Sequence, residues 1–183
     1  MAGVAEDTFA PPGRAAKSRV FWLSMNLVTA FIAASAINLF QDALDKIVYL
    51  AVLMPIIASM GGVAATQTLT ITVRGLALGQ IMSSNYLYLL SREVTVGLVN
   101  GFFWALVLGA ISYFWFNEIT IALIILLSMV INLFMAVISG MGIPLILKFF
   151  KLDPAIAGSV IVTTITDVVG FLSFLGLATI FYS

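Results

Sequence analysis

Long stretches without a charged residue alternate with short charged or polar segments along the chain. Five stretches are long enough to cross a bilayer core of about 30 Å, which needs roughly 20 helical residues. These stretches are 20–41, 47–73, 94–117, 119–147 and 154–183, and the last contains a single charge, Asp167. The pattern therefore predicts an all-α membrane protein with five transmembrane helices.

The interval 75–91 is shorter, and it carries several polar residues and two tyrosines. We expect a short interfacial or re-entrant helix there. The distribution of basic residues favours this interpretation. With five spans and a cytoplasmic amino terminus, seven of the eight lysine and arginine residues lie on the cytoplasmic side, and only Lys46 lies outside. Counting 75–91 as a sixth span would move Arg92, Lys148 and Lys151 to the outside.

The amino-acid composition limits the classes of function that the protein can have. Hydrophobic residues make up 62% of the 183 positions and charged residues 9%, and the net charge is zero, so we expect a lipid bilayer and no nucleic acid as partner. Cysteine and histidine are absent, which excludes disulfides, thiolate or imidazole metal ligands and histidine-dependent catalysis. There is no Gly-rich phosphate loop. We expect a protein that is not an enzyme and that meets any metal with oxygen ligands.

Residues 1–19 are polar and contain two prolines, as expected of a flexible cytoplasmic leader, and 20–183 form the predicted transmembrane domain. The sequence has no convincing internal repeat. An odd number of spans cannot form two equal inverted halves, so any symmetry needed for transport should come from oligomerisation.

Asp167 is the most informative residue, because it is a carboxylate inside a predicted span. It lies thirteen residues after Pro154, about 20 Å along the last helix and near the middle of the bilayer. Such a carboxylate costs at least a few kcal/mol and usually faces an ion path or the interior of a bundle. The alternative is a protonated or hydrogen-bonded structural residue.

Two polar stripes accompany it. On the last span, Ser159, Thr163 and Asp167 follow one another at intervals of four, which places them on one helix face. On the second span, Ser59, Gly62, Thr66 and Thr70 follow one another at intervals of three or four, which also places them on one helix face. Small and hydroxyl residues also mark tight helix packing, and that interpretation stays open for each residue taken alone.

Two further features of the predicted spans concern helix geometry. Pro55 and the Gly61–Gly62 pair can loosen the second helix, and carbonyls exposed at a loosened turn would be good ligands for a hard cation. Amide side chains inside the spans are expected to be buried and to bond between helices; they are Asn26, Asn38, Asn100 and Asn132.

Two segments resemble the signatures of the MgtE family of magnesium transporters. Residues 55–67 read Pro-Ile-Ile-Ala-Ser-Met-Gly-Gly-Val-Ala-Ala-Thr-Gln, and the likeness continues to Gln80. Residues 152–155 and 162–170 read Leu-Asp-Pro-Ala and Val-Thr-Thr-Ile-Thr-Asp-Val-Val-Gly. The resemblance extends over 20–182. It implies a pore domain that forms a homodimer, with the second and fifth spans of both subunits lining one cation path.

Carried over by position, the resemblance implies that Asp167 is the pore carboxylate and that the backbone carbonyls of Gly62 and Thr163 face the ion. Ser59, Thr66 and Ser159 match neighbouring pore positions. The implied ion is Mg²⁺, both transported and bound in the pore, and the implied place is a bacterial or archaeal inner membrane, crossed several times, with the amino terminus in the cytoplasm.

The chain departs from the family pattern in two respects. The family reads Gly-Gly-Asn-x-Gly-Asn-Gln where this chain has Val63 and Thr66 in place of both asparagines, which puts Mn²⁺ or Co²⁺ beside Mg²⁺ as candidate ions. Family members commonly carry cytoplasmic sensing domains, which nineteen leader residues cannot supply. We therefore expect either a natural minimal form or an excised pore domain.

The residues and the resemblance together predict a passive divalent-cation channel. Two alternatives remain at this stage. A proton-coupled carrier would use Asp167 as its titrating group, and a membrane subunit that only packs against partners would explain the small residues but not Asp167.

Overall fold

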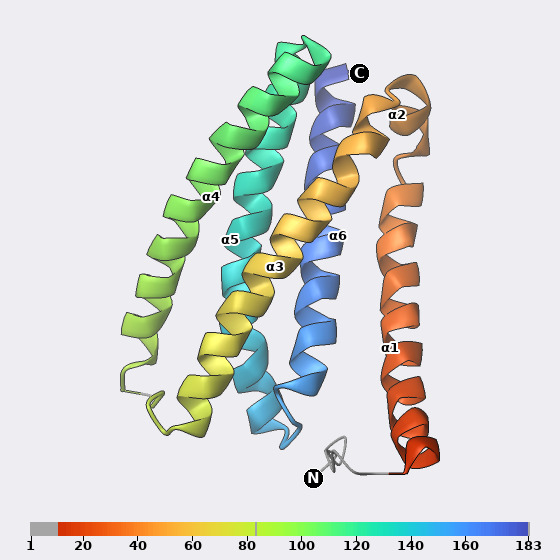
Figure 1. Cartoon of the computed structure of the whole chain (residues 1–183). Helices are drawn as coiled ribbons and strands as arrows, with labels where there is room; N and C mark the ends of the chain where they lie inside the picture. Colours follow the sequence, from red (N-terminus) through yellow and green to blue (C-terminus); the bar gives the residue numbers. More distant parts are fainter. Residues whose placement is uncertain (1–10, 83, 183) are drawn as a thin grey trace.

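The structure is a computed structural model that describes residues 11–82 and 84–182, and it contains helices but no strand over those residues. Five helices are long and apolar enough to cross a membrane, and a sixth is short, which confirms the predicted fold class. In chain order they are α1 (Pro12–Asn38), α2 (Gln41–Lys46), α3 (Tyr49–Ala77), α4 (Tyr86–Phe116), α5 (Ile119–Phe149) and α6 (Ile156–Tyr182), as drawn in Figure 1.

The short helix is not where the sequence placed it. It is α2, between the first two spans, whereas the prediction of a helix over 75–91 is wrong. There α3 ends at Ala77, Gly79 takes a positive φ of 67°, and α4 begins at Tyr86. The Asn85 side chain closes the turn, because it accepts the Met82 N–H at 2.9 Å and donates to the Gln80 carbonyl at 2.8 Å. Polar residues therefore form a turn here rather than one face of a helix.

The first helix extends further towards the amino terminus than the predicted span. Helix α1 begins at Pro12, within the segment interpreted as a flexible leader, although its apolar membrane-spanning part begins only at Arg19. Proline suits this position because the first helical N–H has no partner inside the helix. The remainder of the predicted leader, 1–10, lies outside the described residues.

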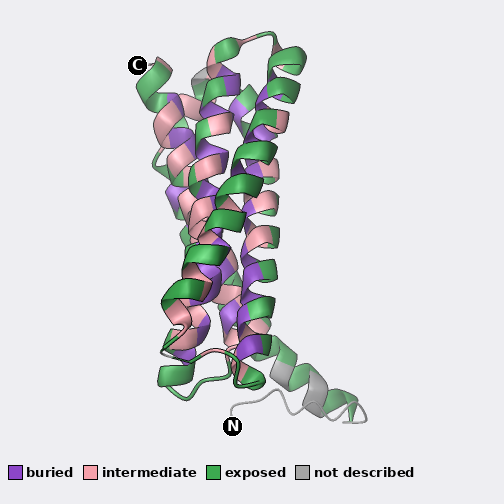
Figure 2. Cartoon of the chain, turned by 90° about the vertical axis from the view of Figure 1, so that its left-hand side faces the viewer, coloured by how far each residue is buried: buried purple, intermediate pink, exposed green. Residues whose placement is uncertain are grey.

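Helix α5 is the centre of the bundle. It packs against α3, α4 and α6, and it contains the largest share of buried residues among the five long helices. Helices α5 and α3 approach each other closely at Gly140, since a Cβ added to this residue would lie 2.8 Å from the Ala65 carbonyl oxygen of α3. Figure 2 shows that buried positions face into the bundle while exposed positions follow its outer surface.

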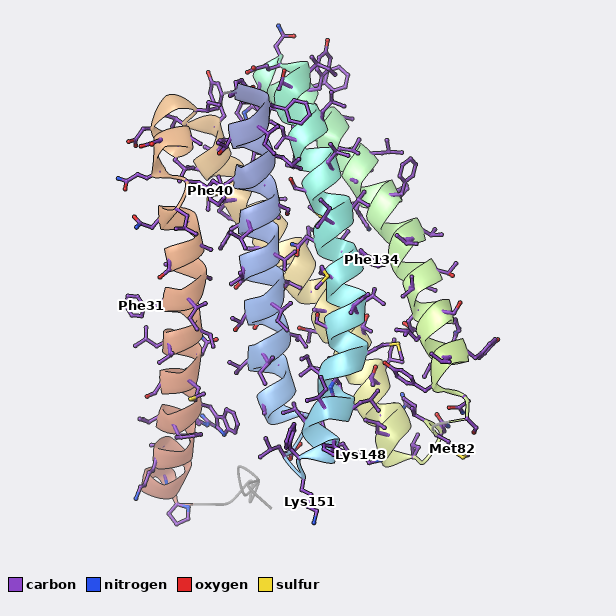
Figure 3. The ribbon with its side chains drawn as sticks, turned by 180° about the vertical axis from the view of Figure 1, so that it is seen from behind. Phe31, Phe40, Met82, Phe134, Lys148 and Lys151 are labelled. Carbon is purple, nitrogen blue, oxygen red and sulfur yellow. The ribbon has the colours of Figure 1, made fainter. Side chains whose placement is uncertain are left out.

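Helix α1 lies at the edge of the bundle and packs on α6 (Figure 1). Phe31 points away from the other helices and is 67% exposed, whereas Phe40, just beyond α1, comes within 3.8 Å of the place where Gly176 would carry a Cβ (Figure 3). The apolar outer face of α1 is therefore suited to contact with lipid.

The two ends of the bundle differ in charge. The start of α1, the turn between α3 and α4, and the loop between α5 and α6 lie together at one end, where Figure 3 labels Met82, Lys148 and Lys151. We call this the basic end. Helix α2, the turn between α4 and α5, and the carboxyl end of α6 lie at the opposite end.

Candidate cation site

Helices α3 and α6 enclose an open groove of about 840 Å³ along one side of the bundle. Eight residues of α3 and two of α6 line it. They are Ala58, Ser59, Gly62, Val63, Thr66, Gln67, Thr70 and Ile71 from α3, and Thr163 and Asp167 from α6. The groove thus brings together Asp167, Thr163, Gly62, Ser59 and Thr66, five of the six residues that the sequence nominated.

Ser159 is the sixth nominated residue, and it does not line the groove. It is half-buried on α6, two turns before Asp167, and its carbonyl accepts the Thr163 hydroxyl at 2.9 Å. Its contribution is therefore to hold the Thr163 side chain, which does line the groove.

The α3 wall of the groove is a regular helix. The structure has α3 unbroken from Tyr49 to Ala77, so the loosened turn expected around Pro55 and Gly61–Gly62 is absent. Proline still removes one N–H from the helix, but the neighbouring helices α5 and α6 pack against α3 and hold it in register. Oxygen ligands from α3 must therefore come from side chains and from carbonyls that are already hydrogen-bonded.

The threonine hydroxyls that line the groove all donate to their own helix. Thr66 donates to the Gly62 carbonyl at 2.7 Å, Thr70 to the Thr66 carbonyl at 2.8 Å, and Thr163 to the Ser159 carbonyl at 2.9 Å. Because a hydroxyl has one hydrogen and two lone pairs, these bonds leave only acceptor capacity for a ligand. Acceptor oxygens of this kind suit a cation, either in direct contact or through the cation's water molecules.

The two carbonyls that the resemblance assigns to the ion are both occupied. The Gly62 carbonyl accepts the Thr66 hydroxyl, and the Thr163 carbonyl accepts the Thr166 hydroxyl at 2.9 Å. In a regular helix each of these carbonyls also accepts the backbone N–H four residues further on, so both of its lone pairs are engaged, and direct contact with an ion would have to displace one of these bonds. The direct role of these carbonyls stays a prediction.

Asp167 carries the charge of the groove. It is half-buried on α6, eleven residues and about 16 Å beyond Ile156, and the other nine lining residues are uncharged. No group of three or more acidic residues that could hold a metal occurs among the described residues. One chain therefore offers a single carboxylate surrounded by neutral oxygens.

Asn132 of α5 holds the two groove helices at a fixed spacing from behind. Its Nδ2 donates to the Ile57 carbonyl of α3 at 2.9 Å, and its side chain fills the space where Gly61 of α3 and Gly170 of α6 would carry a Cβ. Its Oδ1 is buried and has no hydrogen-bond partner among the described residues. Both glycines lie within one turn of a groove residue, namely Gly62 and Asp167.

The interhelical bond of Asn132 confirms one of the four amide predictions. The expectation of burial is wrong for the other three, because Asn26, Asn38 and Asn100 are exposed. They lie on helices α1 and α4, which form the outer sides of the bundle, so position in a span alone does not bury a side chain.

Sequence reasoning missed two polar residues. Gln67 lines the groove one position after Thr66, and it was noted only as part of a motif. Glu93 is 8% exposed and lies inside α4, although its charge was taken to mark the boundary of a span. The residues that follow, Val94 to Gly97, are weak helix formers, so helix propensity gave no signal that the helix contains Glu93.

Comparison with known proteins places the groove in a shared segment. Residues 54–177, which include most of α3 and α6, match MgtE, a family described as divalent cation transporters. Proteins named magnesium transporter MgtE are 32% identical over 91% of this chain in Bacillus subtilis, 30% over 99% in Enterococcus faecalis, and 27% over 88% in Thermus thermophilus. The matched part spans 37%, 40% and 36% of those relatives, respectively.

Proposed function

Because this chain belongs to the MgtE family of divalent cation transporters, we propose that two copies form a membrane pore through which Mg²⁺ passes, with the α3–α6 groove of each copy as half of the wall. The observation that carries the proposal is the groove itself. It is open along one side, and it combines a carboxylate with hydroxyl oxygens that have only lone pairs to offer.

The charge of the ion requires a second copy. A single Asp167 carboxylate would leave a dication with one uncompensated charge in a medium of low dielectric constant, which is costly. A two-fold axis along the open side of the groove would bring two Asp167 carboxylates to one ion. Two carboxylates with several retained waters are the coordination that Mg²⁺ commonly takes in proteins.

The membrane potential suffices to drive the movement. Transfer of one elementary charge across 100 mV is worth about 2.3 kcal/mol, so inward transfer of a dication gains about 4.6 kcal/mol. Passive conduction through the dimer therefore needs no coupled energy source.

The orientation in the membrane follows from the basic end. Five basic residues at the basic end lie in the first or last two turns of a helix or in a loop: Lys17, Arg74, Arg92, Lys148 and Lys151. Segments rich in lysine and arginine remain in the cytoplasm. The amino terminus would then be cytoplasmic, and the protein would be a multi-pass component of the cell membrane of a bacterium or archaeon.

Mg²⁺ uptake into liposomes that contain only this chain tests the proposal. Under an inside-negative potential we expect the parent protein and a control variant, Asp45→Asn in exposed α2, to take up Mg²⁺ at equal rates. Asp167→Asn should lose uptake at least about tenfold, since a loss of 1.4 kcal/mol in ion stabilisation already has that effect. Undiminished uptake by Asp167→Asn would overturn the proposed site, and uptake that follows a pH gradient instead of voltage would overturn passive conduction.

A further inference from the structure

A second cavity lies between helices α3, α4 and α5, and it is open on one side, because lining residues such as Val96 and Trp104 are 46% and 43% exposed. Its volume is about 390 Å³. Most of its walls are apolar, and the polar side chains among the lining residues are Gln67, Thr68, Glu93 and Asn100. Val63, Gln67 and Ile71 line both this cavity and the groove, so α3 forms a common wall between them. We call it the inner cavity.

Glu93 is the single charged residue of the inner cavity. It is 8% exposed and lies seven residues after Tyr86, about 10 Å inside helix α4. Among the described residues its carboxylate has no hydrogen bond and no ion pair. The neighbouring Arg92 does not compensate it, because Arg92 lines a different cavity together with Gln80 and Tyr88. A buried carboxylate within a span requires a counter-charge or a proton.

The other polar residues of the inner cavity supply neutral oxygens. Gln67 and Asn100 each carry an amide oxygen, and Thr68 carries a hydroxyl. Oxygen donors of this kind suit hard cations. Glu93 is the one charged residue among those that line the inner cavity, and this limits the charge that a single chain can balance there. One negative charge balances one positive charge.

The size of the inner cavity sets the hydration of its occupant. A water molecule takes up about 30 Å³ in the liquid, so 390 Å³ is far more than a bare ion fills. We propose that the inner cavity binds a partly hydrated monovalent metal cation, with the Glu93 carboxylate as counter-charge and Gln67, Thr68 and Asn100 as neutral oxygen ligands. This site uses a different carboxylate from the proposed Mg²⁺ path, although Val63, Gln67 and Ile71 border both.

Thermal unfolding of the purified full chain in detergent tests the site. NaCl or KCl replaces N-methylglucamine chloride at constant ionic strength, so screening stays the same. In the parent and in Asp167→Asn, we expect a saturable rise in Tm of about 2–4 °C, as for a ligand that binds only the folded state. In Glu93→Gln the rise should be absent. Asp167→Asn separates this result from the proposed function, because it removes the carboxylate of the groove only.

Several outcomes would overturn the proposal. No rise in the parent, or an equal rise in Glu93→Gln, would remove the cation site. A Tm that ignores Na⁺ and K⁺ but rises on acidification, and does so only while Glu93 is present, would identify a proton as the occupant. Equal stabilisation by choline chloride would identify an organic cation. If Glu93→Gln does not fold, Asn100→Ala at an exposed position must move the Na⁺ or K⁺ midpoint to higher concentration, and an unchanged midpoint contradicts the assignment.

Discussion

At the scale of single residues, the adjacent glycines of α3 have opposite surroundings. A Cβ on Gly61 would lie 2.8 Å from Asn132 Cγ, and Asn132 cannot retreat because Gly170 closes its other side and its amide is bonded to Ile57. A Cβ on Gly62 would meet only Thr163 Cγ2, at 3.8 Å, which is an ordinary contact. The first position therefore requires glycine for packing and the second does not.

Alanine substitutions should separate these two roles. We expect Gly61→Ala to destabilise the protein by about 1–3 kcal/mol through overpacking. Gly62→Ala should leave stability unchanged or raise it by about 0.5–1 kcal/mol, since glycine lowers helix stability relative to alanine. Thermal unfolding of both variants in the same detergent measures the difference, and equal Tm values would contradict the described packing around Asn132.

We predict that ion choice also depends on single residues. Val63 and Thr66 both line the groove, where Val63 offers no polar atom and Thr66 offers a hydroxyl that already donates to Gly62. We predict that Mn²⁺ or Co²⁺ passes at a rate comparable to Mg²⁺, and that Thr66→Asn shifts the ratio towards Mg²⁺. Competition uptake into liposomes measures the ratio. A hundredfold preference for Mg²⁺ in the parent, or no change in Thr66→Asn, would contradict this explanation.

Residue types and helical spacing were enough to find most of the groove. Asp167 stands out because a carboxylate inside a span is costly, and the spacing of Ser59, Gly62 and Thr66 places them on one face of α3. Sequence could not reveal that Ser159 lies outside the groove, because that depends on how far along α6 the groove with α3 extends. It could not reveal the burial of Glu93 either, since burial there depends on where α4 begins.

At the scale of helices, different faces of α3 have different surroundings. One face lines the groove with α6, a neighbouring face borders the inner cavity and shares Val63, Gln67 and Ile71 with the groove, and α3 also packs against α5. Val63 is 54% exposed on the groove side. If the groove is a water-filled ion path in the membrane, the side chain of residue 63 is in contact with water although it lies within a span.

Cysteine substitution tests which helix face is accessible to water. The chain contains no cysteine, so Val63→Cys would carry a unique thiol. We expect it to react with a charged thiol reagent in liposomes and to react more slowly in saturating Mg²⁺. Phe31→Cys on the outer face of α1 is the control, which should stay unreactive in lipid. Equal reactivity at both positions would mean that the groove faces lipid.

The five long helices could be predicted because an apolar stretch of more than 20 residues in a bilayer must bond its backbone internally. Their ends could not. Helix α4 begins eight residues before the predicted span at 94, because a helix continues through Arg92 and Glu93 as long as its backbone bonds are satisfied. The turn at Gly79 and the Asn85 bonds then replace the helix expected over 75–91.

At the scale of the whole molecule, the separation of charge predicts the orientation. Met82 lies in the exposed turn at the basic end, and Asn117 lies in the exposed turn at the other end. In intact cells, an impermeant thiol reagent should label Asn117→Cys from outside but reach Met82→Cys only after the membrane is opened. Labelling in the reverse pattern would invert the topology.

The central claim is that one ion path needs the Asp167 carboxylates of two chains. Its most direct test is co-reconstitution of equal amounts of the parent and Asp167→Asn under conditions in which subunits pair at random. The total amount of protein is the same as in liposomes that contain the parent alone. Random pairing makes about one dimer in four fully carboxylated, so Mg²⁺ uptake should fall to about one quarter of that of the parent alone. Uptake at one half or more would mean that a single carboxylate suffices and would contradict the shared pore.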